Sequence, residues 1–433
     1  MCKSDAFIAM RGLALLVAAL SMVSTSTSFA QGGAWTSKAN MPTARSVLTS
    51  SVVDEKVYVI GGLDQNSNSL ATTEEYDPMT NTWTRKADMP TPRFGHCACA
   101  VNGRIYVIGG LNRGAGFRAT VEEYDPATDT WTAKANMPTA RASLSCSAVD
   151  GKIYAMGGDT LSGRRIIFLS VAEEYDPMTD TWTAKADLPI PRGSFASSAV
   201  GGLIYVMGGW KPGGTAELVE EYHPAFDIWI VKNATIPTPR PDLSASTLNG
   251  IIYVIGGQSR GGGSLSTVEA HDPGSDSWTT KAPMPTDRAN LTTSSANGRI
   301  FAIGGVQYSS PNRPVLSTVE EYDPSAPTSV ETNASSIPTA FVLHQNYPNP
   351  FNPSTTIVYS LPTPQLVKLK VYDVLGHEVA TLVNERKAAG NFQVSFDASK
   401  LTSGIYLYRL EAGDPSTGSG QGFVEIKKMI LVR

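Results

Sequence analysis

Six arginines recur at nearly constant spacing, each after a proline-containing segment: Arg45, Arg93, Arg141, Arg192, Arg240 and Arg288. Guanidinium groups bind carboxylates through paired hydrogen bonds, so six of them around a channel mouth would suit an acidic ligand. Glutamates recur with the same period at Glu74/Glu75, Glu122/Glu123, Glu173/Glu174, Glu220/Glu221, Glu269 and Glu320/Glu321. Buried charges must be paired, so the two sets are expected to neutralise each other. A feature of every copy favours a structural role over a binding site.

Residues found in a single copy are stronger candidates for a binding site. Trp210 lies outside the series of repeated tryptophans, and Lys211 follows it. The other candidates are basic or aromatic residues in variable segments, namely Arg113, Arg118, Arg164, Arg165, Arg260, Tyr308 and Arg313. A basic and aromatic rim suits a sugar or an acidic peptide. The alternative is a set of solvated surface charges with a tryptophan packed against its own loop.

The cysteines and histidines predict no metal or cofactor site, because no group of Cys, His and Asp has ligand spacing. No nucleophile–base pair is visible either, although one assembled across repeats would leave no local signature. Cys97, Cys99 and Cys146 follow the N-terminal segment, an odd number without the spacing of a disulfide framework. They stand where other copies have Ser, Thr or Ala, and are expected to be small packing residues.

The elements that must position these residues form a repeat of about 50 residues. In one copy an apolar run ends at Gly109-Gly110, a loop follows, and Val121–Pro126 carries a Glu-Glu-Tyr-Asp-Pro sequence before Trp131. A segment rich in Ser, Ala and Thr follows each arginine, and turn pairs such as Asn102-Gly103 join it to the apolar run, as in tight hairpins. Six copies with about four short strands each predict an all-β propeller.

These motifs extend over residues 35–324 and resemble the kelch repeat family. The resemblance implies a six-bladed β-propeller, predicted here for residues 31–327, and no particular activity. Trp35 precedes the first complete copy, and the last Asp-Pro pair is followed by no tryptophan. The segment Ala34–Lys38 is therefore expected to supply the outer strand of the last blade and to close the ring. The variable loops after the glycine pairs share one end of the blades, where binding is expected.

Two kinds of enzyme share kelch repeats. Galactose-oxidase-like proteins need a copper site with Tyr and His ligands and a Cys–Tyr link, which the dispersed histidines of this chain do not support. Bacterial sialic acid mutarotases resemble the chain more closely, as exported six-bladed kelch propellers, but none of its residues can be aligned as a unique catalytic group. A sialic acid mutarotase-like sugar epimerase is therefore the alternative to a binding protein, as is a purely structural surface protein.

Both ends of the chain have the character of targeting segments. The apolar run Gly12–Leu20 and a small-x-small site ending at Ala30 predict a signal peptide over residues 1–30. Residues 328–340 read as a Ser-, Thr-, Pro- and Ala-rich linker, and residues 341–433 as a small Ig-like β-sandwich of short strands. No later apolar segment is long enough for a transmembrane helix.

The C-terminal segment resembles the type A C-terminal sorting domain of the type IX secretion system. The matching motifs are Asn346–Thr356, Val371–Gly376, Leu401–Leu410 and the basic end Lys427–Arg433. The resemblance implies that the type IX machinery carries the protein out of the periplasm. The formal net charge of −4 argues against binding to nucleic acid. We therefore expect a secreted or cell-surface protein that binds a glycan or protein ligand through its variable loops.

Overall fold

The computed structural model describes residues 32–326, 340–346, 349, 351–413 and 423–432, and every regular element in them is a β-strand. The chain divides into two compact units, residues 1–329 and 330–433, whose folds are described separately. The predicted signal peptide and the linker up to residue 339 lie outside the described residues. No helix in the described part has the length and apolarity needed to cross a membrane.

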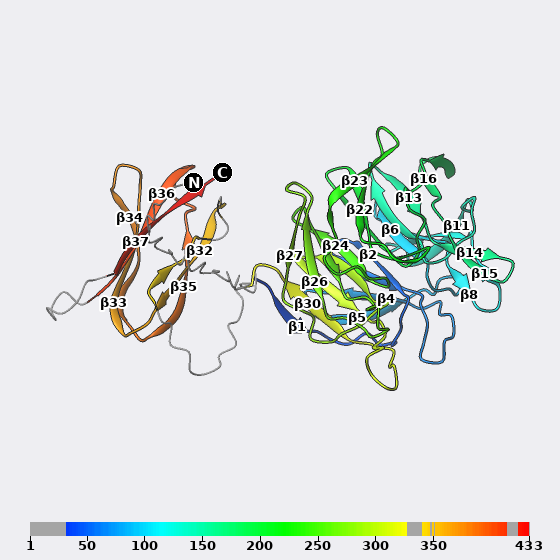
Figure 1. The fold of residues 1–433 in the computed structure, drawn as a ribbon, viewed down its shortest axis with the longest axis horizontal. Helices are drawn as coiled ribbons and strands as arrows, with labels where there is room; N and C mark the ends of the chain where they lie inside the picture. The colour runs from blue at the N-terminus through cyan, green and yellow to red at the C-terminus, as the bar shows by residue number, and fades with distance from the viewer. Residues whose placement is uncertain (1–31, 327–339, 347–348, 350, 414–422, 433) are drawn as a thin grey trace, which may run out of the picture. The chain divides into compact units, whose positions relative to one another are not determined.

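The first unit contains six four-stranded antiparallel sheets within the described residues, here called blades I to VI (Figure 1). In strand order from the inside outwards, blade I has β2 (Thr49–Val53), β3 (Lys56–Ile60), β4 (Thr73–Asp77) and β5 (Thr82–Lys86); blade II has β6 (Cys97–Val101), β7 (Arg104–Ile108), β10 (Val121–Asp125) and β11 (Thr130–Lys134); blade III has β12 (Ser145–Val149), β13 (Lys152–Met156), β16 (Ala172–Asp176) and β17 (Thr181–Lys185).

Blade IV has β18 (Ala196–Val200), β19 (Leu203–Met207), β22 (Leu218–His223) and β23 (Ile228–Thr235); blade V has β24 (Ser244–Leu248), β25 (Ile251–Ile255), β26 (Val268–Asp272) and β27 (Ser277–Thr280); blade VI has β28 (Thr292–Ala296), β29 (Arg299–Ile303), β30 (Val319–Asp323) and β1 (Ala34–Ser37). Short hairpins extend the loops of blades II to IV: β8 (Leu111–Asn112) with β9 (Gly116–Phe117), β14 (Asp159–Ser162) with β15 (Arg165–Phe168), and β20 (Trp210–Lys211) with β21 (Gly214–Thr215). The all-β propeller predicted from the repeats is confirmed.

The second strand of each blade is almost continuously buried, as in β7, because neighbouring blades cover both of its faces. Aromatic residues fill the junctions. Tyr124 lies 5.8 Å from Tyr58 of the preceding blade and 4.9 Å from Trp131 of its own blade, between ring centroids. The indole Nε1 of Trp131 donates to the carbonyl of Ala87, which follows blade I, at 2.9 Å. The repeated Tyr and Trp thus hold each blade to its neighbour.

The N-terminal strand closes blade VI. β1 pairs with β30 in antiparallel register, with Trp35 opposite Tyr322, and the two strands lie side by side in Figure 1. Trp35 donates from Nε1 to the carbonyl of Ala282 at 2.9 Å, and its ring lies 5.1 Å from that of Tyr322. The predicted closure by residues 34–38 is confirmed, and its contacts copy those of Trp131 in blade II.

The inner strands β2, β6, β12, β18, β24 and β28 contact one another in this order, and β28 contacts β2. Just before them, six residues form a circle that we call the mouth ring: Val47, Gly95, Ser143, Ser194, Asp242 and Asn290. Each N–H donates to the carbonyl of the preceding member at 2.7–3.1 Å, and the N–H of Val47 donates to the carbonyl of Asn290. The blades are therefore joined by a closed circle of backbone hydrogen bonds.

The second unit is a β-sandwich. One sheet contains β31 (Val342–Leu343), β32 (Ser354–Leu361) and β35 (Gly390–Asp397), and the other contains β34 (Glu378–Lys387), β33 (Gln365–Tyr372), β36 (Gly404–Ala412) and β37 (Phe423–Leu431). Inward-facing residues of both sheets, among them Ile357, Leu369 and Tyr408, form one buried core. Buried and half-buried positions alternate along most of β36, as expected for a sandwich strand with one face in the core.

Candidate functional site

The six repeated arginines are fully buried and are not available to a ligand. Each forms an ion pair with a glutamate of the third strand of its blade: Arg45–Glu74, Arg93–Glu122, Arg141–Glu173, Arg192–Glu220, Arg240–Glu269 and Arg288–Glu320. In blade III, the second guanidinium nitrogen of Arg141 also donates to the carbonyl of Ala155 at 3.0 Å. These contacts support the structural interpretation of the arginines, which lie inside the blades instead of lining the mouth.

Blade IV departs from this arrangement. In the other blades a threonine hydroxyl donates to the same glutamate, as Thr139 does to Oε1 of Glu173 at 2.8 Å. Ile190 occupies the threonine position in blade IV, so Glu220 has no such donor. Burial raises the pKa of Glu220 above its usual range, although Arg192 opposes the shift. The Arg192–Glu220 pair is therefore the least well satisfied of the six.

The mouth ring forces an unusual backbone conformation on its members. All six residues have φ between 51° and 62°, the left-handed region. A β-branched residue such as Val47 pays for this conformation with steric strain, whereas Asn and Asp tolerate it. The ring thus places one residue from each blade around the centre of the loop face, with a side chain at every position except Gly95. Its members differ in type, so the six-fold regularity of the scaffold ends at this position.

Two carboxyl groups come together at the mouth ring. Asp242 belongs to the ring, and Asp159 follows the glycine pair of blade III at the start of β14. Burial raises the pKa of Asp159 to about 6, against a hydrogen bond from the hydroxyl of Ser143. Burial also raises the pKa of Asp242 to about 6, with a further contribution from the carboxylate of Asp159 and an opposing hydrogen bond from Ser194. Both pKa values therefore lie closer to neutral pH than those of exposed carboxyl groups.

Blade VI adds an amide and an aromatic ring beside these carboxyls. The amide Nδ2 of Asn290 donates to the hydroxyl of Tyr308 at 3.0 Å. Burial raises the pKa of Tyr308, and the carboxylate of Asp242 raises it further. The guanidinium carbon of Arg313, an exposed residue, lies 5.9 Å from the centre of the Tyr308 ring. We call Asp159, Ser194, Asp242, Asn290 and Tyr308 the mouth site.

Trp210 borders the mouth site through the backbone. Its N–H donates to the carbonyl of Gly193 at 2.8 Å, and the N–H of Gly193 donates back at 3.0 Å. A Cβ atom on Gly193 would lie 3.1 Å from Oδ2 of Asp159. The backbone of Gly193 is therefore next to both Trp210 and the Asp159 carboxylate. Trp210 and Lys211 are half-buried and begin the β20–β21 hairpin.

The other candidates from the sequence are dispersed. Arg113 and Arg260 are exposed in the loops of blades II and V, and Arg164 and Arg165 are exposed at the tip of the β14–β15 hairpin. Arg118 is half-buried and its charge lowers the pKa of Arg93, which places it close to a scaffold ion pair. Of the nine proposed binding residues, Tyr308 belongs to the mouth site, Arg313 lies over the Tyr308 ring, and Trp210 borders the site through Gly193. Lys211 pairs with Gly214 in the β20–β21 hairpin.

Asp159, Asp242 and Asn290 were not singled out by the sequence analysis. A copy-by-copy alignment holds the missing signal, because the second residue after each repeated arginine is Val, Gly, Ser, Ser, Asp or Asn along the chain. The residue after each glycine pair is Leu, Leu, Asp, Trp, Gln or Val. Polar and aromatic types at these two positions cluster in blades III to VI.

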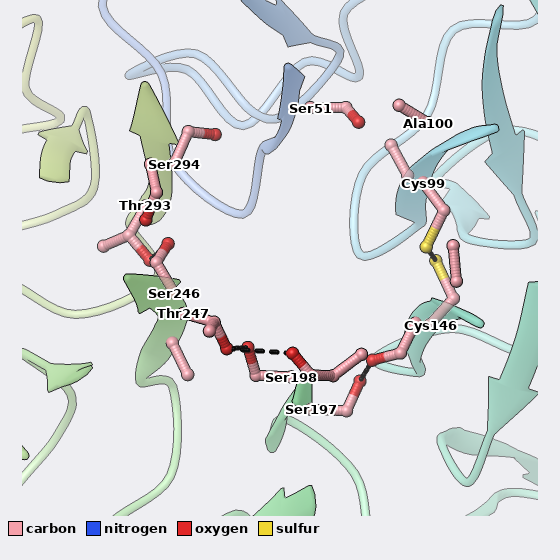
Figure 2. A pocket seen from close by; sticks show the side chains of 16 residues that line it. Ser51, Cys99, Ala100, Cys146, Ser197, Ser198, Ser246, Thr247, Thr293 and Ser294 are labelled. Carbon is pink, nitrogen blue, oxygen red and sulfur yellow. Dashed lines mark hydrogen bonds between the residues drawn. The ribbon is translucent and has the colours of Figure 1, made fainter. Parts of the chain in front are cut away.

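A central cavity of about 250 Å³ lies between the inner strands. Figure 2 shows its wall, where small polar side chains such as Ser198, Ser246 and Thr293 surround an open centre. Hydroxyls bridge neighbouring blades, for example between Ser198 and Thr247 at 2.7 Å. Among the described residues, no three His, Cys, Asp or Glu side chains are placed to hold a metal ion. The residues that line the cavity are Ser, Thr, Cys and Ala, so its wall is polar and carries no charged side chain.

Comparison with known proteins agrees with this architecture. The model of the KLHDC2/KLHL20/DRC7 Kelch-repeats domain matches residues 20–158 and 49–235, and the Kelch motif matches residues 239–285. A solved structure entitled "Structure of YjhT" aligns with a TM-score of 0.57 at 18% identity, over 64% of this chain and 95% of that one. At this identity the similarity concerns the fold alone.

The second unit also matches a family model, that of the secretion system C-terminal sorting domain, over residues 345–419. A type IX sorting domain of this kind implies export and a location at the cell surface or outside the cell, with the type IX machinery as a partner. The repeats, the all-β fold and the two family matches agree with one another. The chain is a kelch-repeat β-propeller protein with a type IX C-terminal sorting domain.

Proposed function

We propose that this exported propeller binds a glycan at the mouth site. The observation that supports the proposal is the grouping of Asp159, Asp242, Asn290 and Tyr308 at a level where the blades differ in sequence. The repeated charges elsewhere in the blades are neutralised by buried ion pairs. The polar groups that are not shared by all blades therefore lie at the centre of the loop face.

Sugar hydroxyls are donors and acceptors on a compact frame with apolar C–H faces. Ionised carboxylates accept from such hydroxyls, the Asn290 amide offers both donor and acceptor atoms, and Tyr308 and Trp210 offer rings for the apolar faces. A few convergent polar groups beside aromatic rings are typical of small-molecule sites. An acidic peptide fits less well, because Asp159 and Asp242 would repel its carboxylates.

A glycan array with the purified chain tests the proposal. Replacement of Asp242 by Asn keeps the shape of the side chain but removes a charged acceptor, and should weaken the best glycan by about 10- to 100-fold. Arg164→Ala, at the exposed tip of the β14–β15 hairpin, is the matched control and should bind like wild type. An array without any hit would refute the proposal and favour a structural surface protein. Equal glycan binding by Asp242→Asn would refute the mouth site as the place where the glycan binds.

A second candidate is a sugar epimerase of the mutarotase kind. It is favoured by the pKa values of about 6 at Asp159 and Asp242, because anomer exchange needs groups that take and give protons near neutral pH. Anomer exchange of sialic acid and of neutral sugars, followed by NMR, separates the two functions. Acceleration that is lost in Asp242→Asn would support the enzyme, and exchange at the buffer rate would exclude it for those sugars.

A further inference from the structure

The wall of the central cavity contains two thiols in contact. Sγ of Cys99, on β6 of blade II, lies 3.0 Å from Sγ of Cys146, on β12 of blade III. Both side chains line the cavity, and Figure 2 shows their sulfur atoms pointing toward each other. The two strands contact each other directly as neighbouring members of the inner circle. The third cysteine of the propeller, Cys97, is buried and does not line the cavity.

The same level of the wall is held by hydroxyl pairs at other blade junctions. Ser145 and Ser147 of blade III each lie 2.8–2.9 Å from the hydroxyl of Ser197 in blade IV. Ser246 of blade V donates to Thr293 of blade VI at 2.9 Å. The Cys99–Cys146 contact is the counterpart of these bridges, with the difference that two thiols can be joined covalently. A bond between them requires the sulfur atoms to approach by about 1 Å, to the usual separation of about 2 Å.

We propose that the exported protein carries a disulfide between Cys99 and Cys146, which covalently joins blades II and III across the cavity wall. The sorting domain implies a route out of the cytoplasm, through compartments in which disulfides form and persist. The bond would close a loop between two residues 47 positions apart in sequence. Such a bond constrains the unfolded chain and fixes one junction of the ring.

The reaction is a thiol–disulfide exchange with an external organic disulfide, either a small molecule or a disulfide oxidoreductase. One cysteine thiolate attacks that disulfide, forms a mixed disulfide and releases one thiol. The thiolate of the second cysteine then attacks the sulfur atom of the first cysteine in this mixed disulfide. The Cys99–Cys146 bond forms, and the rest of the external molecule leaves as the second thiol. Two cysteine S–H bonds are lost, one S–S bond forms, and the external disulfide is reduced to two thiols, so electrons and protons balance.

Peptide mapping by mass spectrometry tests the assignment. The full chain with Cys2→Ser is incubated at mildly alkaline pH with oxidised glutathione, because burial raises the pKa of the Cys146 thiol. Remaining thiols are then alkylated in denaturant. The expected product has a Cys99–Cys146 linkage and one alkylated residue, Cys97. Cys97→Ser should keep the linkage, and Cys146→Ser should lose it.

Serine at position 146 is compatible with the fold, because serines hold the same wall at other junctions. Circular dichroism of each variant verifies that it is folded before oxidation. Alkylation of all three cysteines after prolonged incubation would overturn the proposal. So would a linkage between Cys97 and Cys146, since Cys97 also lies beside the Cys146 thiol.

Discussion

Removing one arginine from the scaffold tests whether the repeated ion pairs stabilise the blades. Arg141 is fully buried, and its guanidinium contacts Oε2 of Glu173 at 2.6 Å. Arg141→Met removes the cation and leaves the Glu173 carboxylate buried without its partner. Loss of one member of a buried pair costs about 3–5 kcal/mol. For a domain of this size about 1 kcal/mol corresponds to 2–4 °C, so Tm should fall by roughly 6–20 °C.

The assay is thermal and urea unfolding of wild type, Arg141→Met and the double variant Arg141→Met/Glu173→Leu. The double variant should regain most of the loss, because an apolar pair replaces the uncompensated charge. Lys152→Met is the control within the same blade. Lys152 forms an ion pair with Glu174 at 2.5 Å but is 41% exposed, so its removal should cost at most about 1 kcal/mol.

Two results would refute this reasoning. A loss for Arg141→Met no larger than that for Lys152→Met would mean that the buried pair adds no more than a surface pair. A double variant as unstable as Arg141→Met would mean that the loss does not come from the unpaired carboxylate of Glu173.

The remaining predictions concern the other departures from the repeat. Ile190→Thr should supply the missing donor to Glu220 and stabilise the protein by about 1 kcal/mol at pH 7. Because the pKa of Glu220 is raised in the folded state, ionisation of this carboxyl group destabilises the fold increasingly as the pH rises above the pKa of the unfolded chain. The stability gained by Ile190→Thr, measured by urea unfolding, should therefore be smaller at about pH 4 than at pH 7. Asp159→Asn should lower the pKa of Asp242, read from its carboxyl carbon by NMR; an unchanged pKa would show that the two groups do not interact. Trp35→Ala should cost about 3–5 kcal/mol in thermal unfolding, and a change below about 0.5 kcal/mol would contradict the closure of the ring by β1.

The sequence predicts the scaffold well because the motifs that specify it recur from repeat to repeat. The glycine pairs, the turn pairs and the repeated tryptophans each recur, so an error in one copy is corrected by the others. Trp35 could be assigned to the last blade because a ring must end with every outer strand filled. The pairing of Arg141 with Glu173 follows from the same period and from the cost of burying either charge alone.

The mouth site is harder to predict for the same reason. Asp242 and Asn290 belong to the mouth ring, which no local sequence pattern predicts. Their backbone conformation depends on hydrogen bonds between blades. Asp159 comes to the ring from the loop of another blade. The contact of Cys99 with Cys146 likewise joins two repeats, and the small residue types at these positions gave no sign of it.

A glycan titration followed through the carboxyl carbon resonance of Asp242 tests the central claim most directly. The glycan is the strongest ligand from the array, and the Asp242→Asn spectrum assigns the resonance. If the mouth site binds the sugar, this resonance shifts with saturation as the glycan is added. The pKa of Asp242 then also departs from its value of about 6 in the protein without glycan. A glycan that binds without moving the Asp242 resonance would contradict the account.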